Sequence, residues 1–580
     1  MSPRDYPYFN RTFFNTPYCL SVLGEGEIGG KADGLFQLEQ HLPHLNSKIV
    51  DAGISIDIPK AVVLRTQVFE DFLRQNKLEF VIQSSSFDDN IVRAFLKSSF
   101  PVYVLGDLKY LVREVKRPLA IRSSSLLEDQ LNAPFAGIYA TKMIPNNQPD
   151  PDVRFKKLIE TIKFVYASTF FTQAQNYARA ANIDFMNEKM AVIIQEVVGE
   201  PHGHFFYPEI SGVMNSINFY AFGHGKPDDG VIHLAFGLGQ TIVQDGVSWS
   251  YSPAFPMHPP PFNSPEDQLK VTQKSFWSVY LGPVERPDPL SEFEFMVKKP
   301  ITELTEIESL KLVASTWDAS SQKIYPGVYR KGPKVIDFAP ILRLEQIPLN
   351  NVLTEILDYF KKTTGQHMEF EFAFTTRKDI KTARLALLQM RPMKLNNEQV
   401  TIEKKELESS DLLVYSGHTL GNGLNSTIKH IMYVEPDEFE IKDSQKIAEC
   451  IRDVNRFCME HSIYYLLIVP GRIGTSDPWL GIPVNWGDIS NVRAIVEMIT
   501  DRLNVDLSLG SHFFHNLNNL GVMFFSVSGK EDHISLQKIR ACKQLQKNQC
   551  VYLLEAEDGL LMKIDGTQQH GIILKQKSSG

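Results

Sequence analysis

An alternating run of apolar and acidic residues, MEFEFAF at 368–374, offers the clearest chemistry in the sequence. In a β-strand, successive side chains point to opposite faces, so the methionine and the phenylalanines share one face. Glu369 and Glu371 then share the other face, about 6 to 7 Å apart. The run therefore predicts a strand with one apolar face and one acidic face.

A second run, LALLQMR at 385–391, follows after ten mostly polar residues and places Gln389 and Arg391 on one face in the same way. If the two strands form a hairpin, two carboxylates, an amide oxygen and a guanidinium converge. Carboxylate and amide oxygens are hard ligands that suit Mg²⁺, which keeps several waters and takes its other ligands from substrate phosphates. A solvated strand face with paired charges accounts for the same pattern, so both interpretations stand.

A glycine-rich segment near the N-terminus, GEGEIGGKA at 24–32, has the composition of a phosphate-binding loop with Lys31 as its cation. It does not fit the Walker A pattern, because Glu25 replaces a glycine and Ala32 replaces the required serine or threonine. A turn that caps the following helix is the alternative interpretation. The segment therefore predicts either a phosphate contact or a helix cap.

Another apolar strand ends in an arginine and three serines, IRSSS at 121–125. This combination suits an anion, because the Arg122 guanidinium offers a two-pronged hydrogen-bond fork and the serines add donors. An arginine that anchors Glu128 or Asp129 explains the segment nearly as well. The segment predicts an anion site at Arg122 or a local ion pair.

The elements that must position these residues follow from apolar spacing. Short apolar runs separated by glycine and serine loops over 18–145 predict mixed α/β structure. Apolar residues spaced close to 3.6 predict helices, whereas a short β-branched run predicts a buried strand. Five prolines at 253–261 predict an extended loop. The expected helices lie at 68–80, 155–181 and 351–362, and the expected buried strand lies at 190–195.

The overall composition excludes several classes of protein. Hydrophobic residues make up 43% and charged residues 22% of the 580 residues, which is typical of globular chains of about two to four domains. A net charge of −8 argues against non-specific binding to nucleic acid or an anionic membrane. No apolar run reaches the ~20 residues that cross a bilayer, and 1–17 lacks a signal-peptide core. Five cysteines without a CxxC spacing indicate a reducing compartment, so we expect a soluble cytoplasmic protein.

A charged stretch with few large apolar residues at 396–411 predicts a linker. It separates a first region, 18–395, from a second mixed α/β region, 412–575. The candidate phosphate and metal residues discussed above all lie in the first region. We therefore expect an α/β protein with a larger first part and a smaller second part.

The first region resembles the nucleotide-binding part of the pyruvate phosphate dikinase and phosphoenolpyruvate synthase superfamily. The order and the number of the matching motifs, rather than any single motif, carry this resemblance. The motifs are GGKA at 29–32, IRSSS at 121–125 with Glu128 and Asp129, FAG at 135–137 with Thr141, AVIIQE at 191–196, SGVM at 211–214, FGLG at 236–239, EFEF at 369–372 and LQMRP at 388–392.

The resemblance implies an ATP-grasp fold, in which two α/β halves clasp ATP. By position, Lys31 and Arg122 would bind phosphates, and Gly137 and Thr141 would lie over the β- and γ-phosphates. Phosphoryl transfer needs little covalent chemistry from the protein, so clustered cations and a metal are the expected catalytic parts. Arg122 and Arg391 would supply two of these cations.

The resemblance also implies which residues hold adenine and the metal. The hinge residues that would meet adenine are Gln195, Glu196 and Val197. The residues that would hold Mg²⁺ beside Arg391 are Glu371 and Gln389, together with Glu369. This set agrees with the hairpin argument, which places carboxylate and amide oxygens on one face.

Three departures from the family pattern bear on activity. Gln240 stands where the family usually has a glutamate after its glycine-leucine-glycine motif. The stretch 138–140, IYA, replaces a more polar one, and the link at 199–210 is longer than usual. ATP binding is still expected, whereas the rate of turnover is left open.

The second region departs further from the family. The 185 residues from 396 onward are too few for an eight-stranded barrel of about 250 residues, which binds phosphoenolpyruvate in the complete family enzymes. The usual Thr-Ser-His-Ala phosphohistidine motif is absent, but GSHFF at 510–514 keeps a Ser-His pair. His512 is therefore one candidate phosphoryl acceptor, and His418 is another; a packed or surface histidine is the alternative for both. PGRIGTSDPWLG at 470–481 predicts an anion-binding turn or a rigid structural turn.

The leading hypothesis is an ATP-dependent, dikinase-like phosphotransferase that binds Mg²⁺ and ATP and passes a phosphoryl group on, with a histidine as the possible carrier. Its acceptor would be a small molecule or a partner protein, and we expect no nucleic acid or membrane partner. A non-catalytic ATP-binding sensor, or a subunit completed by a partner chain, is the rival hypothesis. An ATP-grasp ligase is disfavoured, because the motifs follow the dikinase order.

Overall fold

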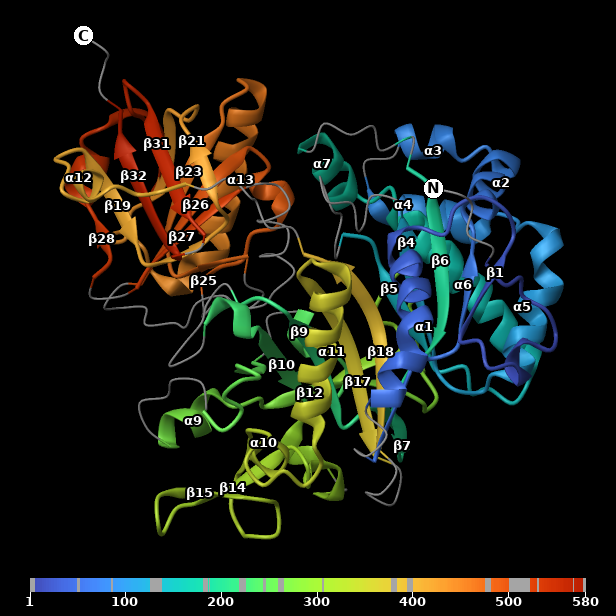
Figure 1. Cartoon of the computed structure of the whole chain (residues 1–580). Helices are drawn as coiled ribbons and strands as arrows, with labels where there is room; N and C mark the ends of the chain where they lie inside the picture. Colours follow the sequence, from blue (N-terminus) through green and yellow to red (C-terminus); the bar gives the residue numbers. More distant parts are fainter. Residues whose placement is uncertain are drawn as a thin grey trace. The chain divides into compact units, whose positions relative to one another are not determined.

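The computed structural model divides the chain into two compact units (Figure 1). Unit 1 comprises residues 1–175 and 184–393, and unit 2 comprises residues 176–183 and 394–580. The residues that the structure describes are 6–48, 53–84, 87–125, 138–180, 186, 188–218, 226–243, 247–258, 265–304, 307–376, 383–393, 400–474, 481–499, 522–528, 531–566 and 568–576. Both units are mixed α/β, as the sequence predicts.

The first sheet of unit 1 has five strands in the order β1-β3-β6-β4-β5 and carries Arg122 on β4. Strands β1 and β3 are parallel, and the other neighbours are antiparallel. The central strand β6 contains the β-branched run predicted as a buried strand, and only its last residue is partly exposed. The strands are β1 (Leu20–Leu23), β3 (Ala61–Leu64), β4 (Leu119–Ser125), β5 (Thr141–Ile144) and β6 (Met190–Glu196).

Helices packed against this sheet enclose an aromatic core. The ring of Tyr166 lies 4.9 Å from that of Phe69 and 5.7 Å from that of Phe72, between centroids. These rings are almost fully buried, so the core stabilises the sheet through apolar area removed from water. The helices are α2 (Thr66–Asn76), α3 (Glu79–Ser84), α4 (Asp88–Lys97), α5 (Val102–Glu114) and α6 (Pro151–Ser168).

Two predicted helices each fold as two. The predicted helix at 155–181 is α6 followed by α7 (Thr172–Ala180). The Asp88 carboxylate accepts a hydrogen bond from the Thr172 backbone N–H at 2.8 Å, which caps a new helix start from a distant part of the chain. The predicted helix at 68–80 divides at Lys77, whose left-handed φ of 50° ends α2.

The second sheet of unit 1 has six strands in the order β11-β10-β9-β17-β18-β2. The predicted hairpin is present: β17 and β18 are antiparallel, with Glu369 opposite Arg391 and Glu371 opposite Gln389. Directly after Glu371 the register shifts, and Leu388 is the extra residue of the resulting β-bulge. The strands are β2 (Ile54–Asp57), β9 (Ile210–Asn215), β10 (Val231–Ala235), β11 (Trp249–Tyr251), β17 (Met368–Thr376) and β18 (Ala383–Pro392).

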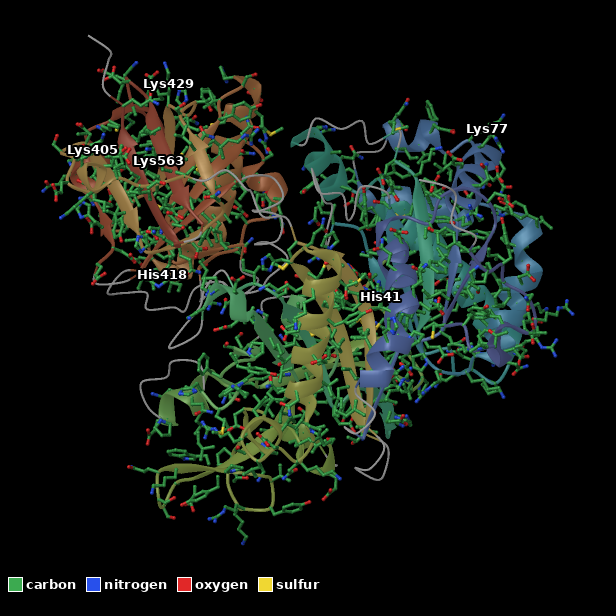
Figure 2. All side chains as sticks on the ribbon, viewed as in Figure 1. His41, Lys77, Lys405, His418, Lys429 and Lys563 are labelled. Atoms are coloured by element: carbon green, nitrogen blue, oxygen red, sulfur yellow. The ribbon has the colours of Figure 1, made fainter. Side chains whose placement is uncertain are left out.

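Two helices cover the apolar face of this sheet. The ring of Phe370 lies 5.0 Å from that of Phe360 on α11 (Leu349–Thr364), the helix predicted at 351–362. Helix α1 (Gly30–Lys48) runs beside α11 in Figure 1, and its His41 ring lies 5.1 Å from Phe360 (Figure 2). Because the helices take the phenylalanine face, the face that carries the two glutamates is left for other contacts.

Smaller sheets complete unit 1. One has the order β13-β12-β8-β7, and its strands β7 and β8 come from the long link at 199–210. Another has the order β15-β14-β16. The predicted loop at 253–261 contains no helix or strand in its described part, 253–258. The elements are β7 (Glu200–His202), β8 (Phe205–Tyr207), α8 (Gln240–Val243), α9 (Pro265–Val271), β12 (Ser275–Tyr280), β13 (Met296–Pro300), β14 (Ala314–Asp318), β15 (Lys323–Pro326), β16 (Lys334–Ile336) and α10 (Ala339–Leu342).

Unit 2 contains two larger sheets, in the orders β21-β31-β32-β19-β28 and β20-β27-β26-β23-β22-β30-β29, and a small pair β24-β25. The strands are β19 (Leu412–Ser416), β20 (His418–Leu420), β21 (Gly423–Asn425), β22 (His430–Val434), β23 (Tyr465–Pro470), β24 (Arg472–Ile473), β25 (Gly481–Ile482), β26 (Val492–Met498), β27 (Met523–Val527), β28 (His533–Ile534), β29 (Lys543–Asn548), β30 (Val551–Glu555), β31 (Leu560–Asp565) and β32 (His570–Lys575). The helices are α12 (Lys404–Leu407), α13 (Ser444–Glu460) and α15 (Leu536–Arg540). Among the helices of the described residues, none combines the length and apolar character needed to cross a membrane.

Candidate functional site

The guanidinium of Arg122 joins the two sheets of unit 1. Its Nη2 donates to Glu371 Oε2 at 2.9 Å and to Gln389 Oε1 at 2.7 Å. Its Nη1 donates to the Leu388 carbonyl oxygen at 2.8 Å. The Arg122 and Glu371 side chains are only 12% and 23% exposed, so their attraction is screened less than that of a surface pair. Strand β4 thus reaches the acidic face of the β17–β18 hairpin through a single side chain.

The backbone oxygen of Leu388 is a part of this site that the sequence did not predict. Leu388 is the unpaired residue of the bulge, and a bulge locally disrupts the ladder and bends the strand. Its carbonyl is therefore available to accept a hydrogen bond from Arg122. No sequence signal marks it, because residues 385–388 are all apolar. The bulge shows only in the pairing, where Leu387 and Gln389 pair with residues on opposite faces of β17.

Gln195 contacts the same guanidinium from the central strand β6. Its Oε1 lies 3.3 Å from Arg122 Nη1, and the residue is only 2% exposed. Within the described part of the chain, its Nε2 is buried without a hydrogen-bond partner. A buried amide donor that lacks a partner costs free energy, which makes this N–H a candidate to bind an acceptor on a ligand.

The other predicted pair of the hairpin forms its own ion pair. Arg391 Nε donates to Glu369 Oε1 at 2.5 Å, and both side chains are almost fully buried. The guanidinium predicted to lie near Gln389 is thus bound to Glu369, while Gln389 itself contacts Arg122. Two arginines therefore balance the two glutamates of the acidic face.

Lys31 lies in the first turn of α1, directly after the glycine-rich loop. Its Nζ donates to Ser123 Oγ at 3.3 Å, and the residue is 8% exposed. The neighbouring Ser124 Oγ donates to the Ile28 carbonyl and accepts from the Ala32 N–H. Ser124 thus bonds the start of α1 and holds the loop against β4, which places Lys31 beside the end of β4. The phosphate interpretation of the loop stays a prediction.

Close approach of this loop to β4 explains one of its glycines. A Cβ added to Gly29 would lie 1.8 Å from the Ser124 carbonyl oxygen, and φ at Gly29 is +77°. No other residue fits there without moving the strand. Gly29 therefore serves the close packing of the loop onto β4.

Thr141 opens strand β5 and pairs with Arg122 in the β4–β5 ladder. Its backbone N–H donates to Glu292 Oε1 at 2.9 Å, a contact that the sequence gave no reason to expect. Burial raises the pKa of the Glu292 carboxyl, and the charges of Lys142 and Lys31 oppose that rise. A carboxylate from the loop before β13 therefore lies close to two predicted phosphate-binding residues.

Glu196 and Val197 lie at the end of β6, beyond Gln195. Val197 is 6% exposed, and its N–H donates to the Pro118 carbonyl. Burial raises the pKa of Glu196, against the opposing charges of Arg117 and Arg384. The structure thus joins Gln195 directly to Arg122, whereas these two predicted residues sit farther along the strand.

Several predicted residues lie elsewhere. Gly137, Glu128, Asp129 and His512 fall outside the described residues. His418 lies on β20 of unit 2 (Figure 2), where its Nδ1 is 3.9 Å from Asp532 Oδ2. This carboxylate raises the pKa of the His418 imidazole.

The donor set around Arg122 fits a small, hard cation. Glu371 offers carboxylate oxygens and Gln389 an amide oxygen, side by side in the ladder, and one oxygen of each accepts a hydrogen bond from Arg122. Mg²⁺ prefers such oxygen ligands and rarely needs a cage made wholly of protein. Within the described ranges, no three histidine, cysteine or acidic residues form a metal cluster, so a metal here would also need ligands from a substrate.

Arginine, lysine and carboxylates gathered between two α/β halves define the class of this site: it can hold a polyanion and its counter-cation. Residues 25–259 match the family model described as the pyruvate phosphate dikinase AMP/ATP-binding domain. This part of the chain is thus similar to the nucleotide-binding domain of the superfamily of pyruvate phosphate dikinase and phosphoenolpyruvate synthase. Glu371, Gln389 and Arg391 lie beyond the matched residues.

Three relatives among named proteins agree with this similarity. Phosphoenolpyruvate synthase of Aeropyrum pernix is 26% identical over 242 residues, which are 38% of this chain and 26% of that protein. The uncharacterized phosphotransferase YvkC of Bacillus subtilis is 25% identical over 38% of this chain and 22% of its own length. Phosphoenolpyruvate synthase of Escherichia coli is 21% identical over 72% of this chain and 47% of its own length. The alignments thus cover less than half of each relative.

Proposed function

We propose that the chain is an ATP-dependent phosphotransferase whose unit 1 binds Mg²⁺ and ATP in an ATP-grasp arrangement over residues 18–395. The single observation that carries this proposal is the position of Arg122. It lies on the strand of the matched nucleotide-binding segment, yet it contacts Glu371 and Gln389 of the hairpin. One side chain thereby connects the family's nucleotide segment to the oxygens suited to a metal.

In this proposal, different residues of unit 1 bind different parts of the ligand. Lys31, Arg122, Gly137 and Thr141 bind the phosphates, with charge-assisted hydrogen bonds from the two cations. The hinge residues Gln195, Glu196 and Val197 meet adenine, and the unpartnered Gln195 Nε2 supports this role. The residues that hold Mg²⁺ beside Arg391 are Glu371, Gln389 and Glu369.

The proposed reaction draws on electrostatics more than on covalent chemistry. Bound Mg²⁺ would neutralise charge on the phosphates, and Arg122 and Arg391 supply fixed positive charge nearby. The low exposure of Arg122 keeps water away from its contacts and strengthens them. The acceptor is a small molecule or a partner protein, reached directly or through a histidine, with His512 as the first candidate and His418 as the second.

A binding-only function is the second candidate, because Gln240 at the start of α8 replaces the usual glutamate of the family motif. In that case the chain is an ATP sensor or a subunit completed by a partner chain. Incubation with γ- and β-labelled ATP, together with equilibrium binding of ATP, separates the two candidates. Label on the protein or on an added acceptor supports transfer, ATP binding without any label supports the sensor, and absence of ATP binding contradicts both.

A further inference from the structure

Arg122 already occupies the oxygens that a metal would need. Its Nη2 lies 2.9 Å from Glu371 Oε2 and 2.7 Å from Gln389 Oε1. Its Nη1 holds two further acceptors, the Leu388 carbonyl and Gln195 Oε1. The guanidinium thus donates hydrogen bonds to groups from both sheets. Its positive charge lies within hydrogen-bond distance of the candidate metal ligands.

A divalent cation on these two oxygens would be repelled by the guanidinium that already binds them. Mg²⁺ requires its ligands at 2.0–2.1 Å in near-octahedral geometry. A guanidinium at hydrogen-bond distance from the same oxygens would face a double positive charge at close range, in a site with little screening. Metal binding is therefore favoured when Arg122 moves away, and a buried guanidinium that leaves needs another acceptor.

The phosphates of a nucleotide are such an acceptor. A guanidinium binds phosphate oxygens in a two-pronged manner, with charge-assisted hydrogen bonds of the same kind as those to a carboxylate. When Arg122 turns to a phosphate, the oxygens of Glu371 and Gln389 become available to a cation that neutralises the same phosphates. Nucleotide binding would thus free the metal ligands from Arg122, and metal binding would favour the turn of Arg122 to the phosphates.

We propose that Arg122 couples the two ligands, so that the site excludes free divalent metal and admits it together with a nucleoside triphosphate. This inference rests on the proposed function and adds a regulation of the same site. Because coupling between two ligands is reciprocal, the metal must raise nucleotide affinity by the same factor as the nucleotide raises metal affinity. The neighbouring Arg391 binds Glu369, so the coupling proposed here concerns the Glu371 and Gln389 oxygens that Arg122 holds.

The test measures binding of Mn²⁺ as a spectroscopic probe for Mg²⁺, by electron paramagnetic resonance of the free ion. The full chain is titrated with Mn²⁺ alone and in the presence of a non-hydrolysable ATP analogue. In the unmodified protein, the analogue should tighten Mn²⁺ binding at least tenfold. In Arg122→Gln, Mn²⁺ alone should bind at least tenfold more tightly than in the unmodified protein, and the enhancement by the analogue should fall accordingly.

Two further variants test whether the positive charge of Arg122 is what excludes the metal. Arg122→Lys keeps the charge, so it should still exclude Mn²⁺ in the absence of the analogue. Arg384→Gln removes a guanidinium from β18, the strand that carries Gln389, where Arg384 pairs with Asp57 at 2.8 Å, and should behave like the unmodified protein. Circular dichroism of each variant shows that it is folded.

The outcomes separate this inference from the function on which it rests. If Arg122→Gln binds Mn²⁺ alone no better than the unmodified protein, while the analogue still recruits Mn²⁺, the coupling is wrong and the metal site stands. If Arg122→Lys gains metal affinity as Arg122→Gln does, charge is not the cause and the coupling is also wrong. If no protein binds Mn²⁺ even with the analogue bound, both the metal site and the coupling are overturned.

Discussion

Glu371 and Gln389 are cross-strand partners at the last regular position before the β-bulge of the β17–β18 hairpin. Their side chains share one face of the sheet, and both accept a hydrogen bond from the same nitrogen of Arg122. The bulge turns the Leu388 carbonyl to the other nitrogen of that guanidinium. Three oxygens of one hairpin thus converge on one cation, which is the geometric basis of the metal hypothesis.

We predict that Glu371→Ala and Gln389→Ala each weaken Mg²⁺-dependent nucleotide binding without unfolding the protein. Each substitution removes an oxygen ligand, and a lost charge-assisted contact costs about 1.5 to 3 kcal/mol, or roughly tenfold to a hundredfold in affinity. Isothermal titration with ATP, with and without Mg²⁺, measures the effect. Glu79→Ala, which removes an exposed acid on α3, is the control. Unchanged titration curves for both hairpin variants would contradict the metal assignment.

We predict that Lys31→Met weakens binding of ATP much more than binding of adenosine. The Lys31 ammonium is buried beside the end of β4, and adenosine offers it no negative charge. The loss for ATP should be about 1.5 to 3 kcal/mol, whereas adenosine affinity should stay nearly constant. Lys109→Gln, which removes the lysine of the exposed Lys109–Asp152 pair, controls for net charge. Equal losses for the two ligands would show that Lys31 serves the structure of the loop.

We predict an ATP-dependent, acid-labile and base-stable label on the protein that His512→Ala abolishes while ATP binding persists. A neutral imidazole is a competent nucleophile near pH 7, and acid lability distinguishes its phosphorylated form from phosphoserine. Labelling with γ- and β-labelled ATP, followed by peptide mapping, tests this directly. Labelling that survives in His512→Ala and disappears in His418→Ala would assign the role to His418.

The contact between His418 and Asp532 provides a further test of the case in which His418 carries the label. Because the carboxylate raises the pKa of His418, a larger fraction of its imidazole is protonated near neutral pH, and a protonated ring cannot attack phosphorus. Labelling at His418 should therefore increase as the pH rises through neutrality. Asp532→Asn should shift this increase to lower pH if the variant is folded. Labelling that does not change with pH would contradict a role for this pair.

We predict that Asp337→Asn flattens the pH dependence of the stability of unit 1. Burial raises the pKa of Asp337 from an ordinary value of 3.8 to about 6, although Ser315 Oγ and the Ala339 N–H both donate to its Oδ1. The folded state thus favours the protonated acid. Its stabilisation is fully present below about pH 4 and is lost as the pH rises through 6, by up to about 3 kcal/mol.

The measurement is urea unfolding followed by tryptophan fluorescence at several pH values between 4 and 8. Asparagine keeps the Oδ1 acceptor and cannot ionise, so the variant should gain stability relative to the unmodified protein as the pH rises. The difference should be smallest near pH 4. A difference that is constant across the range would show that Asp337 titrates normally in the folded chain.

Local sequence patterns predicted the parts of this site that lie on one element. Alternation of side chains in a strand is a property of the backbone, so the faces of the β17–β18 hairpin could be predicted with Glu371 and Gln389 together. The same holds for helix α11, whose apolar residues recur at 3.6 positions and whose end is marked by Gly365 in the left-handed conformation. By contrast, the predicted helix at 155–181 is broken, because its second half starts at a cap from Asp88, 84 positions away in the chain.

The meeting of Arg122 with Glu371 was decided by tertiary structure alone. The two residues are 249 positions apart, and no local periodicity relates a residue on β4 to one on β17. The sequence offered Glu128 and Asp129 as nearer partners for the arginine, and it gave no signal for Glu292 beside Thr141. Such pairs form because two sheets that contribute to one apolar core bring polar faces together, and each buried charge there requires an opposite charge. The sequence by itself therefore determined which residues face which way, and the packing of the two sheets decided which of them meet.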